Sequence, residues 1–241
     1  MAKPIVLIHG AWHAKWCWNK VIPLLAKHNH PTINIDLPGH GTNQADFREI
    51  TLNTYVDYVA QVLKELGEPA VLVGHSFAGV TMSQVAEMMP HTIDRLIYVT
   101  AIVPKNGESL MYEAGLSKSQ AVANELLTDI KNNESELKMS ERLDEIFYNQ
   151  CKIEDILLIK KLLQREPYRP LTEAINVTES KFGKVKKVYI ACENDNSVPI
   201  EDQKRMYIQH GIRACHIRAD HSPFYSTPDE LTEVLVNCFD D

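Results

Sequence analysis

Short apolar segments alternate with longer amphipathic ones through the first half of the chain, and this alternation restricts the fold more than any other feature. Apolar segments such as residues 5–8 and 70–73 carry no polar side chain on either face, which is typical of parallel strands covered by helices on both sides. Residues 51–66 repeat apolar side chains every three to four positions and end at Gly67, which predicts a helix. We therefore predict an α/β protein with a mainly parallel sheet. The expected strands are 5–8, 32–36, 70–73 and 95–99, and the expected helices are 16–28, 51–66 and 76–89.

The alternation stops after the fourth expected strand. Residues 104–180 are charged and poor in strand-like segments, with helical stretches expected at 124–138 and 153–165. Such a stretch is too long for a simple connection, so we expect a helical cap, or lid, subdomain there. A six-stranded core of residues 1–103 and 181–241 would carry this cap. The core is completed by expected strands at 185–192 and 212–218 and by expected helices at 200–210 and 227–239.

Composition excludes several classes of function. Lys and Arg number 25 against 32 Asp and Glu, a net charge of −7, whereas nucleic-acid binding needs a positive surface, so we expect no nucleic-acid partner. No segment approaches the roughly 18 consecutive apolar residues of a membrane span, and the first residues lack the pattern of a secretory leader. The five scattered cysteines form no C-x-x-C motif. We therefore expect free thiols and a cytoplasmic location.

Residues 74–79, Gly-His-Ser-Phe-Ala-Gly, lie between an apolar strand and a helix, which is the context of a nucleophilic serine. Small residues around Ser76 allow a sharp turn that exposes the serine hydroxyl beside a helix N-terminus. The usual pattern is G-x-S-x-G, from which Ala78 departs by one methyl group. A serine that merely caps a helix after a tight turn is the other interpretation of this motif alone.

An activated serine needs a base, and one histidine stands in the right place for it. His221 follows the expected strand at 212–218, on the side of the sheet where this fold class places its base. His210 lies at a helix end and His216 lies within a strand. We therefore predict that His221 accepts the proton of Ser76.

The sequence offers three candidates for the carboxylate that orients the base. Asp195 follows the expected strand at 185–192 and is the preferred candidate, because the order serine, acid, histidine is then kept. Glu193 in the same loop is its near rival. Glu108, after the fourth expected strand, is a more remote one.

Backbone N–H groups are expected to bind the oxyanion that forms when a serine attacks a carbonyl. The first strand ends in His9-Gly10, and a glycine turn there lets the N–H of Ala11 point at the reacting carbonyl together with that of Phe77. Trp12 is expected to border the pocket, and packing of the tryptophan-rich segment on the sheet is the alternative. An apolar lining from the cap is expected from Met111, Tyr112, Phe147 and Tyr148. Packing of these four side chains within the cap itself is the alternative.

The chain resembles the α/β-hydrolase superfamily, and more narrowly its branch of plant methylesterases, hydroxynitrile lyases and related bacterial esterases. The segments that carry the resemblance extend over nearly the whole chain and comprise residues 8–13, 16–18, 36–41, 74–79, 192–199 and 219–221. The resemblance implies an α/β-hydrolase fold without the first two strands of larger hydrolases, a helical cap, and acyl transfer through an acyl-serine. The family's triad and oxyanion roles carry over to Ser76, Asp195, His221, Ala11 and Phe77.

We therefore expect a serine carboxylic-ester hydrolase that acts on small to medium, hydrophobic or aromatic esters, without metal or organic cofactor. A small-molecule ester is the expected partner, and either a monomer or a homodimer is compatible with the sequence. Hydroxynitrile lyases of this family carry threonine at the position of Gly10 and lysine at that of Ser222, which disfavours a lyase. The same fold would also suit a slow ligand-binding receptor, a lactone or thioester hydrolase, or a cofactor-free perhydrolase.

Overall fold

A parallel sheet of six strands forms the centre of the molecule in a computed structural model that describes residues 3–240. Residues 1, 2 and 241, at the ends of the expected core, lie outside the described residues. The strand order is β2-β1-β3-β4-β8-β9, and every neighbouring pair is parallel, which confirms the expected fold class. The strands are β1 (Ile5–Ile8), β2 (Thr32–Ile35), β3 (Ala70–His75), β4 (Ile93–Val99), β8 (Lys186–Cys192) and β9 (Arg213–Ile217).

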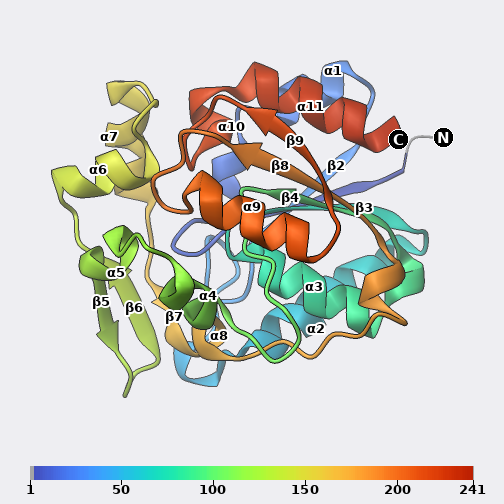
Figure 1. The fold of residues 1–241 in the computed structure, drawn as a ribbon, viewed down its shortest axis with the longest axis horizontal. Helices are drawn as coiled ribbons and strands as arrows, with labels where there is room; N and C mark the ends of the chain where they lie inside the picture. The colour runs from blue at the N-terminus through green and yellow to red at the C-terminus, as the bar shows by residue number, and fades with distance from the viewer. Residues whose placement is uncertain (1–2, 241) are drawn as a thin grey trace.

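Helices cover both faces of this sheet, which explains why β1 and β3 are apolar and buried throughout (Figure 1). On one face lie α1 (Ile22–Lys27) and α11 (Pro228–Asp240), and on the other lie α2 (Leu52–Leu66), α3 (Ala78–Met88) and α9 (Ile200–Gln209). Shorter helices are α10 (Pro223–Ser226), η1 (Lys15–Trp18), η2 (Phe47–Glu49), η3 (Pro90–Thr92) and η4 (Phe182–Lys184). No helix in the described part of the chain combines the length and the apolar character that crossing a lipid bilayer needs.

The helix predicted at residues 51–66 is present as α2, with a capping residue, Thr51, at its start and Gly67 at its end. The Thr51 hydroxyl accepts a hydrogen bond from the Thr54 N–H, and the Thr54 hydroxyl accepts one from the Thr51 N–H. This reciprocal pair satisfies two N–H groups that the first turn leaves without partners. Gly67 ends α2 with φ 69°, in the left-handed region where glycine has no steric penalty.

The prediction of a single helix at residues 16–28 is wrong, because the chain forms two separate helices there. Residues 15–18 form the 3-10 helix η1, and α1 begins only at Ile22. Pro23 stands in the first turn of α1, the one part of a helix where proline needs no hydrogen bond from its nitrogen. The proline therefore starts a new helix and does not continue the preceding one.

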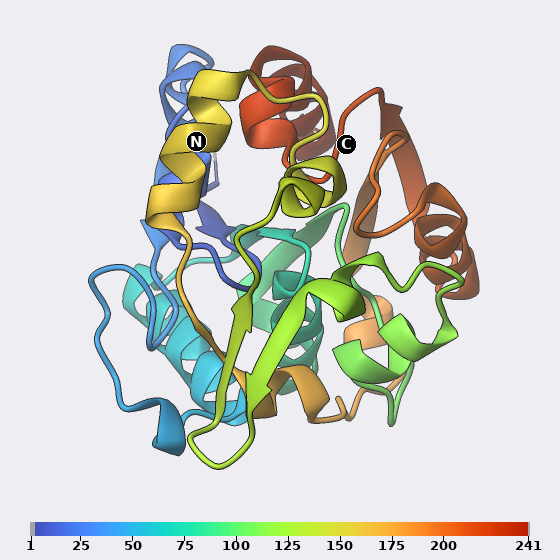
Figure 2. The ribbon, with the colours of Figure 1, turned by 90° about the vertical axis from the view of Figure 1, so that its left-hand side faces the viewer.

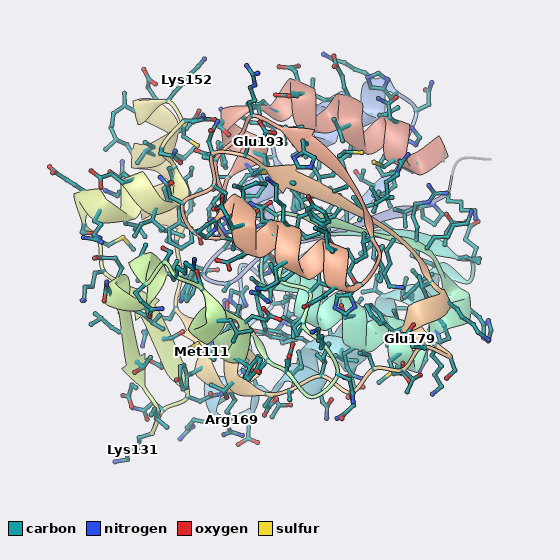
Figure 3. The ribbon with its side chains drawn as sticks, in the orientation of Figure 1. Met111, Lys131, Lys152, Arg169, Glu179 and Glu193 are labelled. Carbon is teal, nitrogen blue, oxygen red and sulfur yellow. The ribbon has the colours of Figure 1, made fainter. Side chains whose placement is uncertain are left out.

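Residues 104–180, called the insert below, leave the sheet after β4 and return at β8, and Figure 2 shows them in front of the sheet. The prediction of a helix at 124–138 is wrong, because these residues form the hairpin of β5 and β6. Together with β7, this hairpin makes a small antiparallel sheet. Asn133, at φ 57°, belongs to the turn between β5 and β6, from which Lys131 projects (Figure 3). The insert comprises α4 (Leu110–Leu116), α5 (Ala121–Glu125), β5 (Leu126–Asp129), β6 (Glu134–Leu137), α6 (Glu141–Phe147), α7 (Ile153–Leu162), β7 (Glu166–Pro167) and α8 (Tyr168–Thr172).

The register of the sheet brings the chemically important turns to one edge. Ile8 at the end of β1 pairs with Gly74 near the end of β3, so the segments that follow these strands emerge side by side. Cys192 and Ile217 pair in the same way at the ends of β8 and β9. Because all six strands run parallel, the loops after β1, β3, β4, β8 and β9 meet at the carboxyl edge of the sheet.

Candidate active site

Ser76 occupies the sharp turn between β3 and α3 with φ 52°. A non-glycine residue in this left-handed region is uncommon and persists only where its surroundings hold it. The turn passes close to its neighbours, since a Cβ on Gly79 would lie 2.3 Å from the carbonyl oxygen of Ile102. Ala78 is buried in the core, so its extra methyl group is accommodated. The segment thus forms the strained strand-to-helix turn that the motif predicts.

Ser76, His221 and Asp195 lie in one hydrogen-bonded row. The Nε2 atom of His221 is 3.1 Å from the Ser76 hydroxyl, and its Nδ1 atom is 2.7 Å from Oδ2 of Asp195. His221 and Asp195 are buried, whereas Ser76 is partly buried and reaches a cavity wall. An ionised carboxylate only accepts, so Nδ1 carries the proton and Nε2 is left to accept from the serine. The row is therefore arranged for removal of the serine proton.

The Asp195 carboxylate is held by donors from two sides. Its Oδ1 atom accepts from the N–H groups of Ser197 at 2.7 Å and Val198 at 2.8 Å. Its Oδ2 atom accepts from the Thr100 hydroxyl as well as from His221. Thr100 was missed in the sequence, where its signal is a polar residue directly after the central strand β4; in the structure it has φ 39°.

The two rival carboxylates lie elsewhere. Glu193, directly after β8 (Figure 3), is exposed, and its Oε1 atom lies 3.4 Å from Nδ1 of His216. Glu108 accepts a hydrogen bond from the N–H of Lys105 at 2.8 Å. Among residues 3–240, the carboxylate that contacts the His221 ring is therefore that of Asp195.

The N–H groups of Ala11 and Phe77 border the serine from two chain segments. A Cβ on Gly10 would lie 2.9 Å from Cβ of Ser76, so the turn after β1 presses directly against the serine and needs glycine. Ala11 and Phe77 are buried, and neither N–H donates a hydrogen bond to any other part of residues 3–240. Buried N–H groups without partners are rare, so both are available to a ligand atom.

Three buried histidines pack around the row in the neutral form. Burial lowers the pKa of His9 to about 3 and that of His13 to about 4, and burial also lowers the pKa of His75 well below its usual range. The Nε2 atom of His75 donates to the carbonyl oxygen of His221 at 2.7 Å, which fixes the backbone behind the base. No group of three or more His, Cys, Asp and Glu side chains in residues 3–240 is placed to hold a metal ion.

These histidines predict that the free energy of unfolding falls as the pH is lowered from 7 to 5. The unfolded chain takes up protons at His9, His13 and His75 near pH 6.5, whereas the folded chain does so only at much lower pH. The unfolded state therefore binds more protons, and His9 and His13 each contribute a loss of about 2 kcal/mol by pH 5, with a further loss from His75. Urea unfolding at pH 7, 6 and 5 measures this slope. An unchanged free energy of unfolding over this range contradicts the prediction.

A cavity of about 90 Å³ opens beside Ser76, between the core and the insert. Trp12, the expected border of the pocket, lies at its wall. Most of the surrounding side chains are apolar or small, and a charged pair, Glu113 with Arg205, closes one part of the wall. The lining includes Trp12, Ser76, Ile102, Val198 and Met206 from the core and Leu110, Glu113, Ala114, Ser117 and Val122 from the insert.

Met111 and Tyr112, which the sequence predicts in the pocket lining, do not line this cavity. One side of helix α4 faces the cavity. Its side chains there recur every three to four residues and are those of Leu110, Glu113, Ala114 and, directly after the helix, Ser117. Met111 (labelled in Figure 3) and Tyr112 therefore lie on other sides of this helix, and Tyr112 is 52% exposed.

Phe147 and Tyr148 do not line this cavity either, but both pack beside the site. The ring of Phe147 meets that of His221 edge-on, with ring centroids 5.2 Å apart. The hydroxyl of Tyr148 lies 3.0 Å from Nε2 of His13. Both side chains are buried, so they support the histidines and leave the cavity wall to α4 and α5.

The α/β-hydrolase class is defined by a nucleophile on a strand-to-helix turn. Its acid and its histidine follow later parallel strands, in that order along the chain, as Asp195 and His221 do here. The alpha/beta hydrolase family model matches residues 5–234, and the chain belongs to this family.

Similar proteins place the chain within the branch that the sequence indicated. It is 30% identical to Methylesterase 9 of Arabidopsis thaliana, covering 99% of this chain and 98% of the relative, and 29% identical to polyneuridine aldehyde esterase of Rauvolfia serpentina, covering 99% and 96%. The crystal structure of polyneuridine aldehyde esterase matches with a TM-score of 0.87 at 26% identity, covering 99% of both chains. A pyrethroid hydrolase from Sphingobium faniae shares the fold, with a TM-score of 0.90 at 24% identity, covering 100% and 98%. Three longer Arabidopsis thaliana relatives also match, and the chain spans 62%, 56% and 55% of their lengths.

Proposed function

We propose that this protein is a serine carboxylic-ester hydrolase. The observation that carries the proposal is the row from the Asp195 carboxylate through His221 to the Ser76 hydroxyl, with that hydroxyl at the wall of a cavity. The names of two relatives covered over nearly their whole length, Methylesterase 9 and polyneuridine aldehyde esterase, support an ester as the substrate.

In the proposed mechanism, Nε2 of His221 accepts the hydroxyl proton while Oγ of Ser76 bonds to the ester carbonyl carbon. The carbonyl oxygen becomes an oxyanion and accepts hydrogen bonds from the N–H groups of Ala11 and Phe77. Asp195 stabilises the imidazolium through the proton on Nδ1. The bond to the alcohol oxygen then breaks, and His221 gives its proton to this oxygen. Water repeats the cycle on the acyl-serine and releases the acid.

We propose that the insert, residues 104–180, acts as the cap of this site, on a core of residues 1–103 and 181–241. Support comes from the cavity, whose wall is shared between α4 and α5 of the insert and the core. Its apolar side chains favour small to medium, hydrophobic or aromatic esters. Substrate selection would then rest largely on the insert.

We also propose a cytoplasmic location. Cys17, Cys151, Cys192 and Cys215 are free thiols, which are typical of a reducing compartment. Longer relatives carry the word chloroplastic in their names, so fractionation of source cells is the appropriate test. Recovery of the protein with an organelle would contradict the proposal.

Hydrolysis of p-nitrophenyl esters from acetate to decanoate tests the proposed function. We expect turnover with an optimum at one acyl length, because the cavity accommodates only a limited apolar chain. Val122→Phe places a larger side chain on the cavity wall and should shift this optimum to shorter esters, with at least about a tenfold loss of kcat/KM for the longest productive ester.

Leu116→Phe is the matched control for this experiment. Leu116 belongs to α4 but is 48% exposed and does not line the cavity, so the optimum should stay where it is in the wild type. A shift in both variants would mean that the insert responds to any added bulk, against a specific lining role for Val122. A wild type that hydrolyses none of these esters would refute the esterase proposal and direct attention to cyanohydrin cleavage, with mandelonitrile as the probe.

A further inference from the structure

A buried carboxylate of the insert, Glu166, contacts the oxyanion turn without belonging to the row of Ser76. Glu166 opens β7 and is 1% exposed. Its Oε2 atom accepts from the N–H of Trp12 at 3.0 Å and lies 2.8 Å from Nε2 of His40. Its Oε1 atom accepts from the Tyr55 hydroxyl at 2.8 Å. One side chain thus joins the turn after β1, the loop after β2 and helix α2.

The Ala11–Trp12 peptide is held at both of its polar atoms. The carbonyl oxygen of Ala11 accepts from Nδ1 of His13 at 2.8 Å, and the N–H of Trp12 donates to Glu166. The carbonyl oxygen of Trp12 accepts in turn from the N–H of Gln164 at 2.9 Å. Trp12 has φ 60°, which a non-glycine residue keeps only where its environment imposes it. The insert therefore supplies a hydrogen bond on each side of the strained residue.

The Glu166 carboxylate also favours the protonated form of His40, which a neutral acceptor would do less well. Both ring nitrogens of His40 face acceptors, the Pro38 carbonyl oxygen at 3.3 Å and Glu166, an arrangement that suits a ring with two protons. Burial alone would lower the pKa of His40, but the Glu166 carboxylate raises it above its usual value. The result is a buried ion pair next to the turn. Buried ion pairs add little to stability compared with apolar packing, so this one is better explained by what it positions.

We propose that Glu166 is a positioning residue for the oxyanion site, acting through the Trp12 N–H to fix the peptide that follows Ala11. The inference rests on the proposed function, in which the N–H of Ala11 binds the oxyanion. The Ala11 N–H belongs to the preceding Gly10–Ala11 peptide, so the contact acts by holding the Ala11 Cα in place. If Ala11 shifts, its N–H is displaced and stabilises the transition state less. Because the donor acts on the oxyanion, loss of Glu166 should affect the transition state more than the bound ester.

Glu166→Gln is the test variant, since glutamine keeps the size of the side chain but removes its charge and one acceptor atom. We expect kcat for the best p-nitrophenyl ester to fall roughly 10- to 100-fold, with KM changed less than about threefold. Affinity for a trifluoromethyl ketone analogue of that ester, which forms a tetrahedral adduct, should fall by the same factor as kcat/KM. A purely structural role would lower thermal stability without this proportionality.

Glu173→Gln is the matched control. Glu173 also lies in the insert, and its carboxylate also accepts from a backbone N–H of the core, that of Leu52 at 2.6 Å, but far along the chain from the oxyanion turn. This variant should keep kcat within about twofold. If Glu166→Gln keeps the wild-type kcat, or if Glu173→Gln loses as much, the proposal is overturned. Should Glu166→Gln fail to fold, Glu166→Asp replaces it, with the carboxylate one methylene further from Trp12 and the same expected losses.

Amide hydrogen exchange separates failure of this inference from failure of the proposed function. Exchange in a peptide covering residues 9–13 should quicken in Glu166→Gln and stay unchanged in Glu173→Gln, whether or not the protein hydrolyses esters. Unchanged exchange in Glu166→Gln would overturn the positioning role. A wild type that is inactive on every ester, with quickened exchange in the variant, would refute the esterase and leave the positioning of the turn supported.

Discussion

Replacing Ser76 with alanine is expected to lower kcat for ester hydrolysis by about 10³-fold or more, with KM little changed. The hydroxyl that lies 3.1 Å from Nε2 of His221 would be gone, so no acyl-serine could form. A residual rate over water would come from the oxyanion donors and from substrate binding alone. Initial rates with the preferred p-nitrophenyl ester, at several enzyme concentrations, measure this loss.

Ser83→Ala is the matched control for the nucleophile. Ser83 is a buried serine of the same helix, α3, and its hydroxyl bonds to the Gly79 carbonyl oxygen and to Tyr98. Its removal should reduce stability but leave kcat within a few fold. A fluorophosphonate should add mass to the peptide that contains Ser76 in the wild type and in Ser83→Ala, and not in Ser76→Ala. Wild-type rates in Ser76→Ala would assign the hydrolysis to another group.

Asp195→Asn is expected to lower kcat by about 10³- to 10⁴-fold, the scale known for such a change in serine protease triads. The N–H groups of Ser197 and Val198 donate to Oδ1 of Asp195, and they would keep the amide oxygen of asparagine at that position. The amide nitrogen would then face Nδ1 of His221 and donate to it. The imidazole would have to carry its proton on Nε2, which leaves it unable to accept the proton of Ser76.

The pH dependence of kcat distinguishes this tautomer change from a general loss of structure. The loss in Asp195→Asn should persist across the neutral range, because deprotonating the imidazolium does not restore an acceptor at Nε2. Glu193→Gln is the control, since Glu193 pairs with His216 and not with the base. Its kcat should match the wild type. A loss in Glu193→Gln as large as in Asp195→Asn would assign the acid to the wrong residue.

The core could be predicted from the sequence because its signals are local. Strands β1 and β3 are continuous apolar segments, and the turns that carry Ser76, Asp195 and His221 follow strands in an order that this fold class imposes. The hairpin of β5 and β6 escaped prediction because strands of four residues are too short to show a twofold alternation among charged side chains.

Other parts of the site are determined by contacts between segments distant in sequence. Thr100 reaches Asp195 across 95 residues, and Glu166 reaches Trp12 across 154. The position of Thr100 after β4 marks it as a candidate but does not identify its partner, and Glu166 stands in no local pattern, so only the folded chain reveals these contacts. The position of Met111 and Tyr112 outside the cavity lining has a related reason, since an apolar residue on a short helix does not reveal which side of that helix faces the cavity.

The insert connects β4 to β8, two neighbouring parallel strands, and so takes the place of the crossover that any such pair requires. Its internal structure takes no part in the pairing of these strands, so a different insert of suitable span would leave the strand order unchanged. Glu166 limits this freedom. A chimaera that exchanges the insert for that of a relative would alter specificity, and would also lose catalytic rate unless a carboxylate at this position is kept.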